Sequence, residues 1–426
     1  MERELDRRTF LALSSVAGAA AIAGCSGGDN GDTTTDAGGT ATDTESPTET
    51  TTTTEPSDDQ SSSTDIDPTD TESALIEPAT LQEWLDAGIV NTDDVYEDRV
   101  VILRVDTGNY SVNGHIPNAV KMATDDAEGP AVLTETRLDG LGETQKLVAS
   151  GSVVDQILQN AGVGPNTTIV LSGEVPMYNA RTYWTLRYWG FPRERIKVLN
   201  GGPTAYADEV GSLTGETPET PETGYTVEGF EETNYALREG LNEMLQLVDD
   251  KNAGESDASI LDLRGPDQDA KIAGSTLDAP DSYTQGGFTE SVKWKPADEI
   301  EDHVFGYEDI EDGDPIVTLC HSGFKGTLAF FALDGILGYD NVSLYDGSWK
   351  FQWKQYNGNQ DPTPNDLWRT DMHERTDGEI TATDLVTIDS DLSSELDELA
   401  TLDANQVKRD DLNYLGASGG DFGCGS

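Results

Sequence analysis

A cysteine followed by a short polar loop is the strongest chemical signal in the sequence. Cys320 comes directly after the apolar run 316–319 and is followed by His321, Ser322, Gly323, Phe324 and Lys325. This order predicts a thiol at the mouth of a strand, wrapped by consecutive backbone N–H groups that face the start of a helix. Gly323 permits the sharp turn that lets these amides converge, and Lys325 adds a cation. The positive potential of such a loop favours a negatively charged sulfur.

The length of this loop separates two chemistries. Thiolate phosphatases of related architecture use Cys-x5-Arg, a longer loop that encloses phosphate, whereas the residue six positions after Cys320 is Gly326. The loop is therefore predicted to accommodate a single sulfur atom rather than a phosphate group. A buried, inert thiol at a strand end is the alternative interpretation of Cys320.

The remaining cysteines and the histidines predict no second catalytic centre. Cys25 and Cys424 lie far from Cys320 in sequence, so neither a disulfide framework nor a zinc spacing is predicted. No metal-ligand spacing connects the four histidines, His115, His303, His321 and His373. Cys424 is interpreted as a free thiol near the end of the chain, with a resolving role toward Cys320 as the alternative.

The net charge constrains the partners of the protein. Lys and Arg number 26 against 81 Asp and Glu, which gives a formal net charge of −55. A polyanion of this kind is not expected to bind nucleic acid. Self-repulsion would loosen a compact chain in dilute buffer, but above molar salt the screening length falls to about 3 Å. Because the acidic residues are spread along the whole chain, the composition favours a halophilic protein over a merely acidic one.

The first 73 residues are predicted to be an export signal followed by a disordered stalk. Residues 1–24 have the layout of a twin-arginine signal, with Arg7 and Arg8 before a short apolar run. The run ends at a lipobox-like segment in which Cys25 is the lipidation site, so a lipid anchor on the outer face of the cell membrane is expected. A transmembrane helix is the alternative. Residues 25–73 are rich in Thr and Asp and predict a disordered stalk.

An internal duplication organises the rest of the chain. The segment 169–202 and the segment 316–347 share an apolar strand, a helix, a Gly-aromatic stop, a second strand and a Gly turn, about 147 residues apart. This pattern predicts an α/β fold of two similar domains, each a parallel sheet flanked by helices. The predicted boundaries are 74–212 for domain 1, 213–228 for a linker, 229–378 for domain 2 and 379–426 for an acidic, Gly-rich tail. Helix 390–402 is the last element expected.

These motifs together resemble the rhodanese-like family in its tandem, exported form. The resemblance rests on the Cys320 loop, on the segment from Asn341 to Trp349, and on Gly114-His115-Ile116-Pro117-Asn118-Ala119 in the first copy. It covers about residues 75–375 and implies two rhodanese-like domains. The implied activity is thiosulfate sulfurtransferase, in which the Cys320 thiolate takes the outer sulfur of a donor and passes the persulfide to cyanide or a thiol. No cofactor and no metal are implied.

The resemblance also implies candidate contacts for the donor anion. Arg264 matches the family's Asp-x-Arg strand end, and Lys271 lies where a substrate-binding cation is common. Lys325 replaces a frequent Arg, which keeps the charge but gives up bidentate geometry. For Arg264, an ion pair at the protein surface is the alternative interpretation.

Two departures from the family pattern bear on activity. The second copy has Gly286-Gly287-Phe288 where Gly-His-Ile is common, and the first copy has Ser172-Gly173-Glu174 in place of the cysteine loop. Domain 1 is therefore expected to be catalytically silent, with His115 in a structural role. A 3-mercaptopyruvate sulfurtransferase, or a non-catalytic surface receptor or persulfide carrier, remains an alternative. The oligomeric state and the physiological donor and acceptor are left open.

Overall fold

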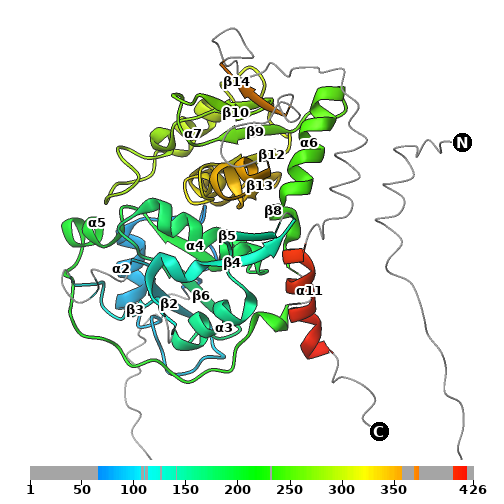
Figure 1. The fold of residues 1–426 in the computed structure, drawn as a ribbon. Helices are drawn as coiled ribbons and strands as arrows, with labels where there is room; N and C mark the ends of the chain where they lie inside the picture. The colour runs from blue at the N-terminus through cyan, green and yellow to red at the C-terminus, as the bar shows by residue number, and fades with distance from the viewer. Residues whose placement is uncertain are drawn as a thin grey trace, which may run out of the picture. The chain divides into compact units, whose positions relative to one another are not determined.

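A computed structural model describes residues 66–106, 110, 114–124, 127–140, 142–230, 233–356, 369–373 and 406–419 (Figure 1). The predicted signal, Cys25, most of the predicted stalk, helix 390–402 and Cys424 lie outside the described residues. In the part of the chain that is described, no helix combines the length and apolar character needed to cross a membrane.

The first sheet contains five parallel strands. Their order is β1 (Leu75–Ile76), β7 (Ile196–Leu199), β6 (Thr167–Leu171), β2 (Arg99–Arg104) and β3 (Val120–Lys121). All residues of β2, β6 and β7 are buried. Strands covered on both faces read as continuous apolar runs, which is why these segments lack the alternation of a half-exposed strand.

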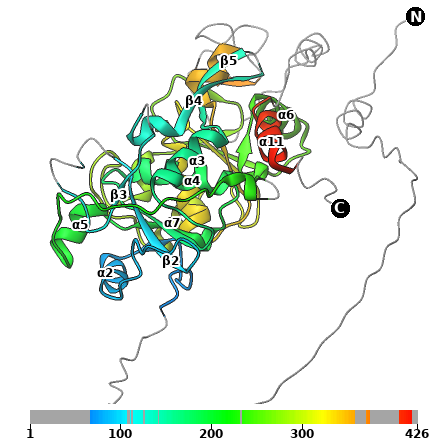
Figure 2. The same cartoon turned by 90° about the horizontal axis from the view of Figure 1, so that it is seen from below.

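Helices and one hairpin complete the first domain. The helices are α2 (Pro78–Asp86), α3 (Gly151–Asn160), α4 (Pro176–Tyr188) and α5 (Gly202–Glu209), and the hairpin pairs β4 (Thr134–Asp139) with β5 (Gly142–Val148). Helices α2 and α5 pack against each other beside the first sheet (Figure 2). Helix α4 is buried on nearly all sides because it packs both on the first sheet and on α8 of the second domain.

The second sheet repeats the order of the first. It runs β11 (Ser275–Leu277), β9 (Ser259–Asp262), β12 (Ile316–Leu319), β13 (Val342–Tyr345) and β8 (Arg238–Glu239), with every pair parallel. Strands β3, β2, β6, β7 and β1 hold the same places in the first sheet. The prediction of two parallel α/β domains is confirmed.

Helices and a small ribbon surround the second sheet. They are α6 (Leu241–Ala253), α7 (Ala297–Val304), α8 (Gly326–Phe330) with its π-helical continuation η7 (Phe331–Leu337), η8 (Ser348–Trp353) with α9 (Lys354–Tyr356), and the antiparallel pair β10 (Ala270–Ile272) and β14 (Thr370–Met372). The apolar side of α6, with Met244, Leu245 and Val248, packs in one cluster with Ile260 and Val317 of the sheet.

The alignment of Gly286-Gly287-Phe288 with the family's Gly-His-Ile segment is wrong. In the first domain, that segment leads into β3, which pairs in parallel with β2. Its counterpart β11 pairs in parallel with β9 and is preceded by Lys271 to Gly274, so Lys271 occupies the place of His115. Asn118 and Gly274, at matching positions before the strands, share a left-handed backbone with φ of +64° and +73°. The match was missed because lysine stands in place of the histidine.

A buried carboxylate joins the two domains. Asp334 of η7 accepts a hydrogen bond from Tyr183 Oη at 2.6 Å and pairs with Arg187 Nε at 3.0 Å and Arg193 Nη2 at 2.9 Å. Burial raises the pKa of Asp334, but its hydrogen bonds and its ion pairs with the two arginines outweigh burial and hold the pKa below its usual range. The junction therefore depends on an ionised carboxylate from the second domain.

The predicted Gly-rich tail contains a helix that the sequence did not suggest. Helix α11 (Gln406–Gly419) buries Val407 and Asp411, and Asp411 accepts a hydrogen bond from Tyr188 Oη at 2.7 Å. Arg137 of β4 pairs with the same carboxylate at 2.6 Å. Contacts with the first domain hold this helix, so a local composition rich in Gly and Asp did not reveal it.

Candidate active site

Cys320 lies at the carboxyl end of β12, the central strand of the second sheet. Ligands of open parallel sheets gather at this edge, so the position is the one that the sequence pattern predicts. The exposed fraction of Cys320, however, is 0%. The expectation of an open strand mouth is therefore not met, and the thiol is enclosed by surrounding residues.

One amide of the loop after the cysteine points at the sulfur. The N–H group of Ser322 donates a hydrogen bond to Cys320 Sγ at 3.4 Å. Gly323 has φ of +73°, and a Cβ atom there would approach the carbonyl oxygen of Asp346 to 2.6 Å. Only glycine fits both conditions. Within the described residues, the N–H groups of Gly323, Phe324 and Lys325 meet no hydrogen-bond acceptor, so they are available to an anion.

The start of η8 holds the Cys320 loop through hydrogen bonds. Ser348 Oγ accepts a hydrogen bond from Cys320 N at 3.3 Å and donates one to the carbonyl of Tyr345 at 2.7 Å. Trp349 N and Lys350 N donate to the carbonyls of Cys320 and His321 at 3.0 and 2.9 Å. Ser348 takes φ of +50°, a left-handed conformation that is costly for a residue with a side chain. Sequence reasoning missed this residue, and its place directly after Asp346-Gly347 was the available signal.

The predicted cations occupy different environments. Lys325 Nζ lies 5.5 Å from the centroid of the Phe288 ring. Arg264 is buried, pairs with Asp262 at 2.6 Å and stacks 3.9 Å from the centroid of Trp349. The ion-pair interpretation of Arg264 therefore describes its geometry, except that the pair is buried rather than exposed.

Lys271 is placed as a structural residue. Its exposed fraction is 0%, and Nζ donates a hydrogen bond to the carbonyl of Ser275 at 2.6 Å. Its counterpart His115 is also buried, stacks on Tyr110 at 3.8 Å and lies 3.0 Å from the carbonyl of Glu216 through Nε2. Both side chains thus tie the backbone before a strand to nearby carbonyl groups, which agrees with a structural role for His115.

The pKa of His321 reflects the positive charges around the loop. Burial lowers its pKa, and the nearby charges of Arg264 and Lys325 lower it further, against a smaller effect of Asp262. His321 is therefore neutral at and above neutral pH. Arg264, Lys325, Asp262 and Lys350 are thus all within electrostatic range of His321.

The first domain contributes side chains to the same place. Tyr178 of α4 packs edge-on against Phe324 with ring centroids 6.1 Å apart. Arg181 of α4 donates a hydrogen bond from Nη1 to the carbonyl of Gly323 at 3.0 Å. Sequence reasoning missed Arg181, although an arginine within the aromatic-rich segment 178–189 was an available signal.

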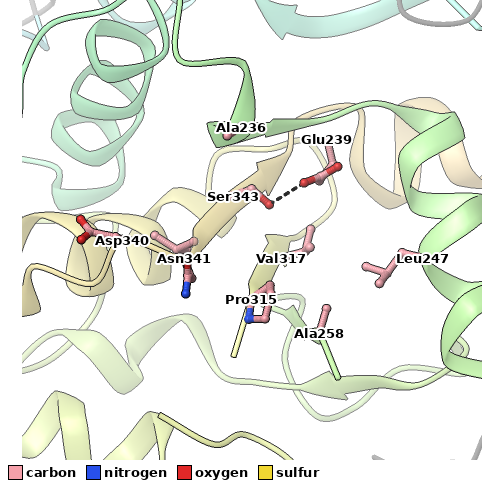
Figure 3. Close-up of a pocket in the computed structure, with 10 residues that line it drawn as sticks. Ala236, Glu239, Leu247, Ala258, Pro315, Val317, Asp340, Asn341 and Ser343 are labelled. Atoms are coloured by element: carbon pink, nitrogen blue, oxygen red, sulfur yellow. Dashed lines mark hydrogen bonds between the residues drawn. The ribbon is translucent and has the colours of Figure 1, made fainter. Parts of the chain in front are cut away.

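The cavity found in the second domain lies elsewhere. It has a volume of about 260 Å³ and is lined at the amino ends of the strands by residues such as Pro315, Val317 and Asn341 (Figure 3). Glu239 accepts a hydrogen bond from Ser343 Oγ at 3.0 Å beside this cavity, and burial raises the pKa of Glu239 to about 7. None of its lining residues belongs to the Cys320 loop, so it is not the site of the thiol. Among the described residues, no group of three or more metal-ligating side chains is found.

The second domain matches a known protein family. Residues 241–355, which include β9, β12, β13 and the Cys320 loop, match the family described as Rhodanese-like domain. Residues 241–355 therefore form a rhodanese-like domain. For this part of the chain, the match confirms the resemblance that the sequence motifs indicate.

Relatives extend over both domains. A protein of Haloferax volcanii named "Putative thiosulfate sulfurtransferase" is 29% identical over 59% of this chain and 84% of its own length. The "Sulfur carrier protein TtuD" of Thermus thermophilus is 26% identical over 65% of this chain and 92% of its own length. Among solved structures, the anaerobic ergothioneine biosynthesis enzyme from Chlorobium limicola has a TM-score of 0.51 at 18% identity, covering 68% of this chain and 70% of that one. The last comparison supports the fold alone.

Proposed function

We propose that this protein is a sulfurtransferase that moves sulfane sulfur from thiosulfate to a thiophilic acceptor through a persulfide on Cys320. The observation that carries the proposal is the loop itself. One amide donates to Cys320 Sγ, and three more have no acceptor in the described part of the chain. Free N–H groups in the loop that follows a thiol favour an anionic ligand at that loop.

The reaction balances as two displacements at sulfur. The Cys320 thiolate attacks the outer sulfur of thiosulfate, a new S–S bond forms, and the original S–S bond breaks with its electron pair leaving on sulfite. The outer sulfur of the persulfide is then attacked by cyanide or by a thiolate. This step releases thiocyanate or a new persulfide and returns the Cys320 thiolate.

The surrounding side chains are assigned separate roles. Lys325 lies one residue before α8 and is the cation proposed to receive the sulfonate part of the donor. Arg264 is proposed to fix the loop through Asp262 and Trp349 rather than to bind the donor directly. Lys271, which is buried and bonded to Ser275, is not included in the donor site. Because Cys320 is fully buried, the donor reaches it only after the residues that enclose the thiol move aside.

The decisive experiment measures thiocyanate from thiosulfate and cyanide at molar salt, for the parent protein and for Cys320→Ser. Thiocyanate from the parent alone is the expected result, and equal rates for both proteins would remove Cys320 from the reaction. Intact mass after thiosulfate alone should increase by one sulfur atom in the parent. A persulfide without thiocyanate would instead support a sulfur carrier, the activity that the name of the Thermus thermophilus relative gives. Replacing thiosulfate with 3-mercaptopyruvate in the same assay tests the other donor.

We also propose export by the twin-arginine route and a lipid anchor at Cys25, on the sequence evidence of Arg7, Arg8 and the lipobox-like segment. The test is fractionation of a halophilic host that expresses the chain. Cys25→Ser should release the protein from the membrane fraction, whereas replacing Arg7 and Arg8 by Lys should retain it inside the cell. Unchanged membrane association of Cys25→Ser would contradict the anchor.

A further inference from the structure

Arg181 of the first domain reaches the loop of the second. It lies in the middle of α4 with an exposed fraction of 0%, and its Nη1 donates to the carbonyl of Gly323 at 3.0 Å. Its Nη2 lies 3.4 Å from the carbonyl of Lys146 in the hairpin of the first domain. A single side chain thus connects β5, α4 and the Cys320 loop.

The guanidinium of Arg181 forms no ion pair within the described residues. Three other buried arginines, Arg104, Arg238 and Arg264, each have a carboxylate oxygen within 3.0 Å, whereas the fully buried Arg99 has none within 4.0 Å in the described part of the chain. No described carboxylate oxygen lies within 4.0 Å of Arg181 either, and its Nε makes no hydrogen bond. Burying a cation without a partner is expensive, so a negative charge on the neighbouring Cys320 loop would stabilise Arg181.

The rings around Arg181 compensate only part of this cost. Its Cζ lies 4.6 Å from the Trp184 centroid and 5.3 Å from the Phe324 centroid, both within cation–π range. Burial lowers the pKa of Arg181 to about 10, and the negative charges of Asp346 and Cys320 raise it. Asp346 already accepts hydrogen bonds from Arg238 Nε and Val148 N. Asp346 therefore has partners of its own, and Cys320 is the other acidic group that acts on Arg181.

We propose that Arg181 is a positioning residue supplied by the first domain, which fixes the Cys320 loop through Gly323 and stabilises an anionic sulfur at Cys320. The thiolate part of this inference stands alone, and the persulfide part rests on the proposed sulfurtransferase function. It assigns a task to a domain that has no cysteine of its own among its described residues. Among the described residues, the other charged or titratable groups around the loop are the pairs Arg238–Asp346 and Arg264–Asp262, together with His321, Lys325 and Lys350.

The test uses the full chain with three single variants. Arg181→Gln keeps an N–H donor for Gly323 but removes the charge, and Arg181→Lys restores the charge. Arg99→Met is the matched control, because Arg99 is also a fully buried arginine of the first domain that donates to a carbonyl, that of Gly162 at 3.0 Å. All three are checked for thermal unfolding midpoints at molar salt.

The first measurement is the pH dependence of alkylation of Cys320 by a small neutral reagent, followed on its own peptide by mass spectrometry. Arg181→Gln should move the alkylation midpoint upward by about 1 pH unit, the lower end of what a neighbouring cation produces. Arg181→Lys should recover most of this shift, and Arg99→Met should leave the midpoint where it is in the parent. A midpoint for Arg181→Gln equal to that of Arg99→Met would overturn the proposal.

The second measurement is the rate of thiocyanate formation, which should fall about tenfold in Arg181→Gln and recover in Arg181→Lys. If the parent forms no thiocyanate, the proposed function fails, while the alkylation midpoints still decide the role of Arg181. If Arg181→Gln does not fold, Arg181→Lys decides alone. An upward shift of 1 pH unit in that folded, charge-preserving variant would also overturn the proposal.

Discussion

Two loops occupy the same place in the two domains and are built in opposite ways. In the first, Ser172-Gly173-Glu174 follows β6, and its amides are bonded to side chains: Gly173 N to Asn179 Oδ1 at 2.7 Å and Glu174 N to Asp106 Oδ2 at 3.1 Å. In the second, the amides after Cys320 are open apart from the bond to its sulfur. The sheet order is the same in both domains. The comparison shows that the fold provides the position, while the side chains around each loop decide whether an anion is accepted.

The largest effect expected is loss of the nucleophile, which separates the two loops. Cys320→Ser should lower thiocyanate formation by a factor on the order of a thousand or more, because the reaction has no other described thiol. Adding Ser172→Cys to that variant should restore nothing, since the amides of the first loop are occupied. Restored activity in the double variant would show that sheet position alone is sufficient.

The Asp334 carboxylate, which joins the two domains, gives the next largest effect. Asp334→Asn should lower the free energy of unfolding by about 3 kcal/mol at pH 7, because Arg187 and Arg193 lose the charge they share. The pKa of Asp334 is lowered in the folded protein, so its contribution is present above the ordinary carboxyl pKa and is lost as the pH falls toward the folded value. Denaturant unfolding of both proteins at pH 7 and in acid measures this. Asp340→Asn, which removes the exposed partner of Arg193, should change little at either pH.

A smaller effect is expected from the backbone conformation of Gly323 in the Cys320 loop. Gly254→Ala should cost about 1 kcal/mol of stability because φ is +72° there, and Gly323→Ala should cost more, because its Cβ would also clash with the Asp346 backbone. Only Gly323→Ala should also lower sulfur transfer, by roughly tenfold, since its Cβ would meet the backbone of Asp346 whereas the space around Gly254 is open. Thermal unfolding and thiocyanate rates for the two variants give both numbers. Equal transfer rates would show that the turn tolerates a side chain.

The smallest effect is expected at His321. Its pKa is lowered by burial and by neighbouring cations, so it is uncharged from neutral pH upward. His321→Asn should therefore leave the thiocyanate rate between pH 7 and pH 9 within about twofold of the parent, because no proton is gained or lost there. A change in the shape of this pH profile would give His321 a role in proton transfer that the second loop is not expected to need.

The sequence predicted the parts of the site that are local. The strand before Cys320, the Gly323 turn and the repeated domain could be predicted because each leaves a contiguous pattern of apolar residues and glycine. The burial of Cys320 and the contact from Arg181 could not, since they depend on how α4 of one domain packs on the other. The equivalence of Lys271 and His115 was missed because the two buried side chains hold the same place in their domains but are of different chemical types. Helix α11 was missed because tertiary contacts, and not its own composition, hold it.

The enclosure of the thiol has a kinetic consequence. If the sulfur is reached only after the enclosing residues move apart, the rate of persulfide formation at high donor concentration is set by how often this opening occurs. A stronger nucleophile would not increase that rate. The same enclosure shields a loaded sulfur from stray reductants between turnovers. The proposed persulfide would then stay on Cys320 until an acceptor small enough to enter arrives.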